Sequence, residues 1–324
     1  MNTLSQELMA AFKYNVRLEE VPDRDFQDLT MTYGLTPMLP MHLGFDPVIA
    51  TLRFFEQKGF KIKLIFGDTY LKMENKLQMN EEEYRNVCDY YKYIFRASGL
   101  KNAEFVLHSE ATANSTYWFL LANLANDMSL RNVYQSLPAE YRDKAIPLAK
   151  SLHTLMQTAD VEYFKASYVL GSLTQERIYF VSRDLLRKNK LPVPGVILIS
   201  EINDLFGNTL KESSSKSRLS FHENADSLRR KLEQLDPKDT ATITSIFLNS
   251  ILPYGKVKFK DRYLTPERLD ELLRKLDDRL FEEMIELIYN KLLKRLNKLN
   301  QGFKKNPKLI EWIDLDRVRA IGTK

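Results

Sequence analysis

The chain has 324 residues, of which 44% are hydrophobic and 28% charged, and its formal net charge is +5. This size fits one large domain plus a smaller one, and the weak positive charge permits an RNA partner without requiring one. The single cysteine, Cys88, excludes an internal disulfide, and the histidines at 42, 108, 153 and 222 lack metal-ligand spacing, so no metal site is predicted. The cysteine content favours a reducing, cytoplasmic location. No apolar run reaches the roughly 20 residues that span a bilayer, which predicts no membrane partner.

The first 71 residues contain an N-terminal helix pattern and a longer unit that favours nucleotide binding. Within residues 1–31, S-Q-E-L-M-A-A-F-K-Y-N-V predicts a short amphipathic helix packed against the main domain. Residues 32–71 contain a Pro-punctuated loop, the tetrapeptide H-L-G-F, the apolar helix pattern V-I-A-T-L-R-F-F-E-Q and the strand pattern I-K-L-I-F. Loop, helix and strand in this order predict one βα-type unit.

The tetrapeptide H-L-G-F has the features of an anion-binding helix start. Gly44 removes a side chain where the helix begins, so backbone N–H groups and the positive end of the helix dipole can face a ligand. Pro47 suits the first helical turn, and His42 can donate a hydrogen bond to a phosphate. The alternative is a plain capping turn, and an isolated H-x-G pattern does not decide between them.

The segments that follow extend an α/β pattern. Asn80 and the acidic run after it predict a helix that stops at Gly99. The alternating run N-A-E-F-V-L-H-S-E predicts a second strand of a parallel sheet. Residues 112–150, which include W-F-L-L-A-N-L-A, predict a mostly helical insertion.

Residues 153–186 begin with an apolar helix pattern that contains two polar residues, Gln157 and Asp160. The turn G-S-L-T-Q-E-R-I-Y and a second helix pattern follow. Gln157 and Asp160 are three residues apart and therefore share a helix face. A carboxylate inside a pocket accepts hydrogen bonds only, so it selects a ligand with a donor hydroxyl. The alternative is an ordinary helix with an exposed polar side.

The C-terminal third combines a serine–lysine stretch with helices. L-K-E-S-S-S-K-S-R-L occupies residues 210–219 and, alone, is also typical of a linker. From about residue 226 the pattern is wholly helical. In the last long helix an apolar stripe predicts the buried face, and a separate basic face predicts contact with an RNA backbone or, alternatively, a solvated surface. The stripe is Ile285, Ile288, Leu292, Leu296 and Leu299, and the basic residues are Lys291, Lys294, Arg295 and Lys298.

Taken together, H-L-G-F, residues 153–186 and residues 210–219 resemble the motifs of a class I aminoacyl-tRNA synthetase, of the archaeal and eukaryotic tyrosyl-tRNA synthetase family. The resemblance covers about residues 30–300. It implies an α/β fold with a Rossmann-like nucleotide-binding parallel sheet in residues 1–222, including the helical insertion and a KMSKS-like loop at 210–217. It also implies a small all-α, tRNA- and anticodon-binding-like domain at 223–324. In that family the insertion forms the dimer interface; an ordinary core helix is the alternative.

The resemblance also implies the ligands, which are ATP as its Mg²⁺ complex, an amino acid and tRNA, and it implies a homodimer. It assigns roles to individual residues as well. Glutamines would face the α-amino group and Asp160 the phenol hydroxyl. The implied catalytic residues are His42, Lys211 and Lys216. The implied ATP-binding residues are His42, Gly44, Phe45, Lys211, Ser213, Ser214 and Lys216. The implied substrate-binding residues are Thr32, Gly34, His153, Gln157, Asp160 and Gln175, and the implied RNA-binding residues are Lys291, Lys294, Arg295 and Lys298.

Departures from the family pattern leave the amino acid and the rate of ATP turnover open. The family has tyrosine where this chain has Thr32 and His153, and methionine where it has Glu212. Residues 38–40 replace small residues, and Phe45 replaces a histidine, as in eukaryotic relatives. The primary interpretation is an ATP-dependent tyrosine–tRNA ligase. The alternatives are a non-charging paralogue that binds RNA or regulates, and an adenylating enzyme with a non-tRNA acceptor.

Overall fold

The computed structural model describes residues 4, 6–8, 16–22, 29–77, 79–137, 147–199 and 218–313. The chain forms two compact units whose sequence ranges interleave. The first comprises Met1–Met38, Leu52–Cys88 and Gly99–Ser200, and the second comprises Leu39–Thr51, Asp89–Ser98 and Glu201–Lys324. The domain boundary predicted at residue 222 remains a prediction.

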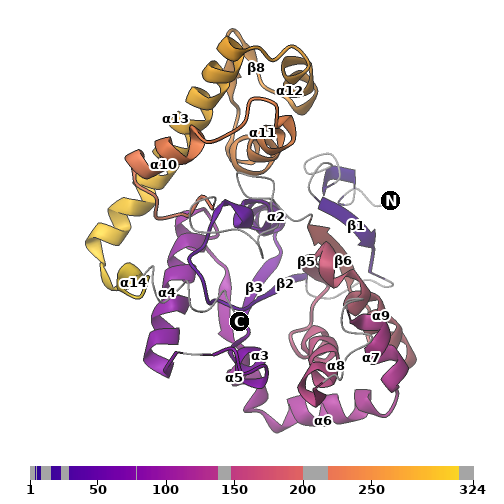
Figure 1. Cartoon of the computed structure of the whole chain (residues 1–324). Coiled ribbons are helices and arrows are strands. Elements are labelled where there is room, and N and C mark those ends of the chain that lie inside the picture. The colour runs from indigo at the N-terminus through magenta and orange to yellow at the C-terminus, as the bar shows by residue number, and fades with distance from the viewer. Residues whose placement is uncertain are drawn as a thin grey trace. The chain divides into compact units, whose positions relative to one another are not determined.

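The first unit is built on a six-stranded sheet in the order β1-β6-β5-β2-β3-β4 (Figure 1). All neighbouring pairs are parallel except β1 and β6, which are antiparallel. The predicted Rossmann-like parallel sheet is therefore confirmed. The strands are β1 (Val16–Glu20), β2 (Thr30–Leu35), β3 (Lys61–Phe66), β4 (Glu104–Leu107), β5 (Tyr168–Ser172) and β6 (Gly195–Ile199).

Strands β1 and β2 were not predicted from the sequence. Residues 32–35 were assigned to a loop because two prolines follow them, yet β2 pairs with β3 on one side and β5 on the other. A central parallel strand is covered on both faces, so it lacks the alternation that marks a half-exposed strand. Thr30, Met31 and Thr32 are accordingly all buried.

The helices of the first unit cover the sheet and extend beyond it. The helices predicted after H-L-G-F and after Asn80 are confirmed as α2 and α4, which contribute residues to both units. Residues 112–150 contain α6 and α7, as the predicted insertion requires. The helices are α2 (Asp46–Gln57), α3 (Asp68–Met73), α4 (Glu81–Ala97), α5 (His108–Thr112), α6 (Ser115–Ala125), α7 (Leu130–Ser136), α8 (Leu148–Tyr163) and α9 (Glu176–Lys188).

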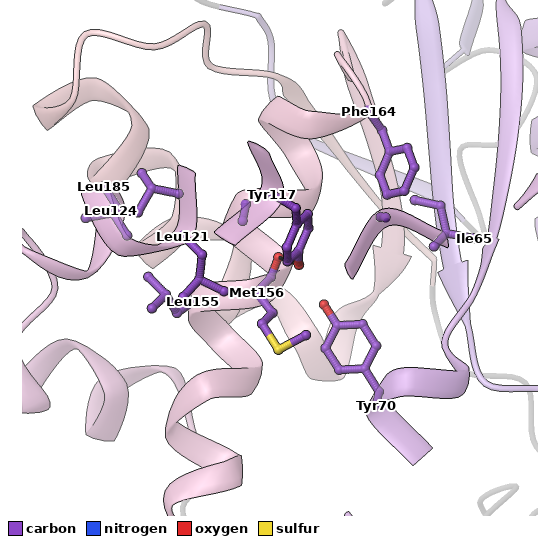
Figure 2. Close-up of a cluster of buried hydrophobic side chains, with 11 residues drawn as sticks. Ile65, Tyr70, Tyr117, Leu121, Leu124, Leu155, Met156, Phe164 and Leu185 are labelled. Atoms are coloured by element: carbon purple, nitrogen blue, oxygen red, sulfur yellow. Dashed lines mark hydrogen bonds between the residues drawn. The ribbon is translucent and has the colours of Figure 1, made fainter. Parts of the chain in front are cut away.

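A buried cluster joins α3, α6, α8 and α9 to the sheet (Figure 2). Leu121 and Leu124 of α6 pack with Leu155 of α8, while Ile65 of β3 lies on the other side of the cluster. Tyr70 and Tyr117 are also members, and Figure 2 shows their hydroxyl groups on the same side of Met156. The apolar packing therefore fixes two phenol groups close to α8.

The second unit is mainly helical and contains α13, the long helix in Figure 1, with α10 packed beside it. The predicted apolar stripe of α13 is confirmed, because its five residues are all buried. Within the described ranges, no helix combines the length and apolar composition needed to cross a bilayer. The helices are α10 (Ala225–Leu232), α11 (Thr240–Ile246), α12 (Pro266–Leu273), α13 (Asp278–Lys305) and α14 (Lys308–Glu311).

The prediction of a wholly helical C-terminal region was wrong at residues 258–263. Strands β7 (Lys258–Phe259) and β8 (Arg262–Tyr263) form a short antiparallel hairpin. The sequence K-V-K-F-K alternates with a period of two, which is typical of a strand: Val257 and Phe259 are buried. Lys260 has a φ of 53°, which turns the chain between the strands.

Candidate active site

The first unit contains a cavity of about 330 Å³ at the carboxyl ends of the central strands. The strand order reverses between the neighbouring strands β2 and β5. From β2 the chain continues toward one edge of the sheet through β3 and β4, and from β5 it continues toward the other edge through β6. Open α/β sheets bind ligands outside such a switch point. The structure brings the six predicted substrate-binding residues together around this cavity: Thr32, Gly34, His153, Gln157, Asp160 and Gln175.

One face of α8 forms a wall of the cavity. Lys150, His153, Gln157 and Asp160 follow one another at intervals of three or four residues and all line it. That spacing keeps side chains on one helix face. The polar side of α8 is therefore turned to a cavity rather than to bulk water, which excludes the alternative of a merely exposed face.

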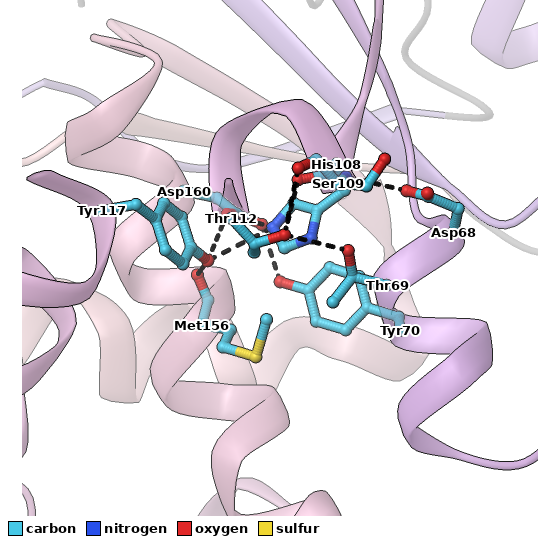
Figure 3. A network of polar contacts seen from close by, with 9 residues as sticks. All are labelled: Asp68, Thr69, Tyr70, His108, Ser109, Thr112, Tyr117, Met156 and Asp160. Atoms are coloured by element: carbon cyan, nitrogen blue, oxygen red, sulfur yellow. Dashed lines mark hydrogen bonds and ion pairs between the residues drawn. The ribbon is translucent and has the colours of Figure 1, made fainter. Parts of the chain in front are cut away.

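Asp160 is held by three donors from other elements (Figure 3). The Tyr70 hydroxyl donates to Oδ2 at 2.7 Å, and the Tyr117 hydroxyl donates to Oδ1 at 2.8 Å. His108 Nε2 also lies 2.8 Å from Oδ1 and must carry the proton, because a carboxylate only accepts. A carboxylate has about four acceptor positions, so about one remains for a ligand.

The phenols beside Asp160 stay protonated at all physiological pH values. Burial, and then the charge of Asp160, raises the pKa of Tyr70 well above its ordinary value. The same causes, in the same order, raise the pKa of Tyr117. Both hydroxyls are therefore permanent donors to the carboxylate.

A second layer of hydrogen bonds fixes α3 against α5 (Figure 3). The backbone N–H of Ser109 donates to Asp68 Oδ1 at 2.9 Å. The hydroxyls of Thr69 and Thr112 lie 3.3 Å apart. Because Tyr70 and His108 are the adjacent residues, these bonds hold the two partners of Asp160 in place.

The Glu74 carboxylate lines the cavity beside the start of α8. Glu74 accepts from Lys150 Nζ at 2.5 Å, from His153 Nδ1 at 3.1 Å and from Lys76. Burial raises the pKa of Glu74, but the hydrogen bonds from His153, Lys150 and Lys76 outweigh it and hold that pKa well below its ordinary value. The ring of Tyr70 lies 4.6 Å from the ring of His153.

The Glu74 contact determines which nitrogen of His153 can accept a hydrogen bond. The ionised carboxylate needs a donor, so Nδ1 carries the proton and Nε2 of the neutral ring is an acceptor. Next along α8, the side-chain oxygen of Gln157 is buried without a hydrogen-bond partner among the described residues. When the His153 ring is neutral, His153 and Gln157 offer the cavity two acceptors, which suits an ammonium group.

In the second unit, residues 42–46 form a tight turn into α2. His42 caps the turn: its Nδ1 accepts from the Gly44 N–H at 3.1 Å, and its carbonyl accepts from the Phe45 N–H at 2.9 Å. Burial, followed by the charge of Arg218, lowers the pKa of His42 to about 3. The neutral ring therefore carries its proton on Nε2, where it is available as a donor.

The same turn pairs with the segment that follows the predicted KMSKS-like loop. The Leu43 N–H donates to the Leu219 carbonyl at 2.9 Å, and the Phe221 N–H donates to the Met41 carbonyl at 2.9 Å. The loop residues Lys211, Glu212, Ser213, Ser214 and Lys216 lie outside the described residues. Their predicted roles remain predictions.

The basic face predicted on α13 is only partly as expected. Lys291, Lys294 and Lys298 are exposed. Arg295 is not: its side chain is 16% exposed and is ion-paired with Asp46. The assignment of Arg295 to RNA contact stays a prediction, although its guanidinium already pairs with a carboxylate.

Sequence reasoning missed several polar residues around Asp160 and on the surface. Tyr70 and Glu74 line the cavity, and His108 and Tyr117 are hydrogen-bonded to Asp160. No motif in the sequence marks these four residues. The hairpin carries the exposed residues Lys256, Lys258 and Tyr263, with both lysine nitrogens within 6 Å of the ring centroid. A second, open groove of about 510 Å³ is lined by Arg131, Tyr134, Arg177 and Phe180, among others.

Comparisons with known proteins agree with this geometry. The family model described as tRNA synthetases class I (W and Y) matches residues 25–260. The tyrosine–tRNA ligase of Methanocaldococcus jannaschii is 25% identical over 297 residues, which cover 91% of this chain and 92% of that protein. The tyrosine–tRNA ligase of Picrophilus torridus is 26% identical over 212 residues, 62% of this chain, and the match spans 64% of that relative, less than two thirds of its length. The crystal structure of tyrosyl-tRNA synthetase from Archaeoglobus fulgidus with L-tyrosine superposes with a TM-score of 0.77 at 20% identity, covering 95% of this chain and all of that one.

Proposed function

Because the chain belongs to the class I tRNA synthetases of the tryptophan and tyrosine (W and Y) family, we propose that it is an ATP-dependent ligase that activates tyrosine and transfers it to a tRNA. The observation that carries the choice of tyrosine is the environment of Asp160. Three protein donors hold its carboxylate and leave about one acceptor position in the cavity. A ligand phenol supplies the matching donor.

The other polar groups of the cavity suit the backbone of an amino acid. The side-chain oxygen of Gln157 and Nε2 of His153 accept from the α-ammonium group, and Gln175 lies on the same cavity. Thr32 and Gly34 leave room beside the ring, since a Cβ at Gly34 would meet no atom within 4 Å. In this proposal the ring lies toward Asp160 and the ammonium group toward Gln157.

The proposed chemistry has two steps and needs no side-chain nucleophile. A carboxylate oxygen of tyrosine attacks the α-phosphorus of ATP, the bond to the β-phosphate breaks, and pyrophosphate leaves. A ribose hydroxyl at the tRNA 3′ end then attacks the acyl carbonyl, and AMP leaves. Positioning and charge stabilisation supply the catalysis.

Residues of the second unit serve the phosphates in this proposal. His42 donates through Nε2–H, and the turn at Gly44, whose own N–H is bonded to His42 Nδ1, holds that ring in place. Lys211 and Lys216 are proposed to neutralise the leaving pyrophosphate, with ATP bound as its Mg²⁺ complex. Glu212 would oppose this charge, so we expect a weaker ATP affinity than a methionine there would give.

The tRNA is proposed to lie on the basic surface of the second unit. Lys291, Lys294 and Lys298 are exposed along α13, and Tyr263 on the hairpin offers a ring on which a base can stack. Charge reversal at the three lysines should weaken binding of every tRNA and flatten its salt dependence, without changing adenylate formation. Filter binding at two salt concentrations tests this, and unchanged affinity and slope would refute it.

We also propose that the protein is a homodimer in the cytoplasm. Phe119 and Leu130, in the helical insertion, are each 71% exposed, and a partner that covered them would remove this apolar surface from water. A second copy of the chain is the proposed partner. Sedimentation of the wild type and of Phe119→Asp tests the assembly: the variant should be monomeric.

Calorimetry with tyrosine, phenylalanine and tryptophan tests the proposed substrate directly. Phenylalanine lacks the donor for Asp160, and a site with an unpaired polar group rejects such an analogue strongly. We expect tyrosine to bind at least tenfold more tightly than phenylalanine. Equal affinities, or tighter binding of tryptophan, would contradict the tyrosine assignment.

A further inference from the structure

Unlike the exposed lysines of α13, Arg295 forms an ion pair with a buried residue, Asp46. Arg295 Nη1 lies 2.8 Å from Asp46 Oδ2, and Nη2 contacts Oδ1. The Asp46 side chain is fully buried. A two-point arginine–carboxylate contact sets the orientation of both groups, which a single-point lysine contact does not.

Asp46 belongs to the turn that the proposed function assigns to ATP. It is the first residue of α2 and directly follows H-L-G-F. The hydroxyl of Tyr91 donates to the Leu39 carbonyl at 2.7 Å, and its ring meets Phe45 edge-on at 5.9 Å. The turn is therefore held from α4 on one side and from Arg295 of α13 on the other.

The same guanidinium also touches the segment that follows the KMSKS-like motif. Its carbon Cζ lies 4.8 Å from the ring centroid of Phe221. Phe221 is hydrogen-bonded to Met41 through its backbone, as described above. Five residues further along α13, the Asn300 amide donates to the Glu223 carbonyl at 2.8 Å. One side chain of α13 thus contacts both segments on which the ATP motifs depend.

We propose that Arg295 is a positioning residue for ATP, which holds residues 41–46 and 218–221 in register and ties both to α13. The proposal rests on the proposed function, because it assigns these segments to ATP. It also gives RNA bound along the exposed lysines of α13 a direct mechanical connection to the ATP segments. No contact between Arg295 and RNA is required.

Kinetics without tRNA test the proposal. Tyrosine-dependent ATP–pyrophosphate exchange is measured for the wild type, Arg295→Met and Arg295→Lys, with Asn297→Met as a control on the exposed side of the same helix. We expect Arg295→Met to raise the KM for ATP at least tenfold and to leave the KM for tyrosine within twofold. Arg295→Lys should recover part of the loss, and Asn297→Met should match the wild type.

The other outcomes overturn the proposal in recognisable ways. Unchanged exchange with a raised KM for tRNA in charging would make Arg295 an RNA contact. A similar rise of both KM values, with a lower melting temperature, would make the ion pair merely structural.

A failure of the proposed function is distinguishable. If the wild type shows no exchange, the Kd for ATP is measured by calorimetry: at least tenfold weaker binding by Arg295→Met supports the positioning role, and equal binding refutes it. Absence of ATP binding by the wild type would refute both proposals.

Discussion

Two histidines, one in each unit, are held in opposite tautomers by their neighbours. His153 donates its Nδ1–H to Glu74, so in the neutral ring its Nε2 is an acceptor. His42 accepts the Gly44 N–H at Nδ1, so its Nε2 is a donor. The first suits an ammonium group and the second suits a phosphate. The partner of one ring nitrogen therefore decides what the other can bind.

The two histidines also differ in the kind of group that surrounds them. The cavity in the first unit is defined by side chains: α8 supplies Gln157 and Asp160, and groups from α3, α5 and α6 hold the Asp160 carboxylate. The turn in the second unit is defined by backbone groups and by its pairing with residues 219–221. We therefore expect single substitutions to change the cavity more than the turn.

The largest expected effect is that of Asp160→Ala in the cavity. Removing the carboxylate leaves Tyr70, His108 and Tyr117 without their common partner, so the free energy of unfolding should fall by about 3 kcal/mol. Tyrosine binding should weaken by about 1–3 kcal/mol. Denaturant titration and calorimetry measure the two effects.

A matched control is Asp89→Ala on α4, where an exposed aspartate pairs with Lys92. This change should alter the free energy of unfolding by less than about 0.5 kcal/mol. If both variants lowered the free energy of unfolding equally, Asp160 would not be held by the three hydrogen bonds described above.

The next effect concerns His42 and pH. Its folded pKa is about 3, below the value of about 6.5 for an unfolded chain, so between these values the unfolded state binds the extra proton and stability falls as pH falls. His42→Asn keeps a cap acceptor but does not titrate. From pH 6.5 to 4.5 the wild type should lose about 2–3 kcal/mol more than this variant. Denaturant titrations at both pH values measure these free energies of unfolding. An equal loss in the wild type and in His42→Asn would show that His42 is not buried in neutral form.

The smallest of the three effects is that of Glu74→Gln. Without the carboxylate, His153 is free to place its proton on Nε2, so the KM for tyrosine should rise about five- to tenfold, or about 1 kcal/mol. The KM for ATP should not change. Steady-state exchange kinetics measure both values.

His153→Tyr provides the background that isolates this effect. A tyrosine has no tautomer to set, so Glu74→Gln should add little to the KM for tyrosine in that variant. The same loss in both backgrounds would mean that Glu74 acts on the cavity through Lys150 or Lys76 instead.

Sequence reasoning was successful where one element carries the whole signal. The spacing of Gln157 and Asp160 predicted a shared face of one helix, and both line one cavity. The buried stripe of α13 was predicted for the same reason, since periodicity is local information, whereas the Rossmann-like sheet was implied by the family resemblance.

The partners of Asp160 could not be predicted in this way. Tyr70, His108 and Tyr117 lie 90, 52 and 43 residues away along the chain and meet only because the sheet and the core cluster bring α3, α5 and α6 to α8. Arg295 shows the same limit on α13. Its position on the helix was predictable, but its ion pair with Asp46, 249 residues away, was not.

Amino-acid-dependent ATP–pyrophosphate exchange, measured with each standard amino acid in turn, tests the central claim most directly. The account predicts exchange that depends on tyrosine, is much weaker with phenylalanine at the same concentration, and needs a higher tyrosine concentration in Asp160→Ala. Exchange that depends on another amino acid would contradict the assignment of tyrosine. No exchange with any amino acid would contradict the proposed ligase activity itself.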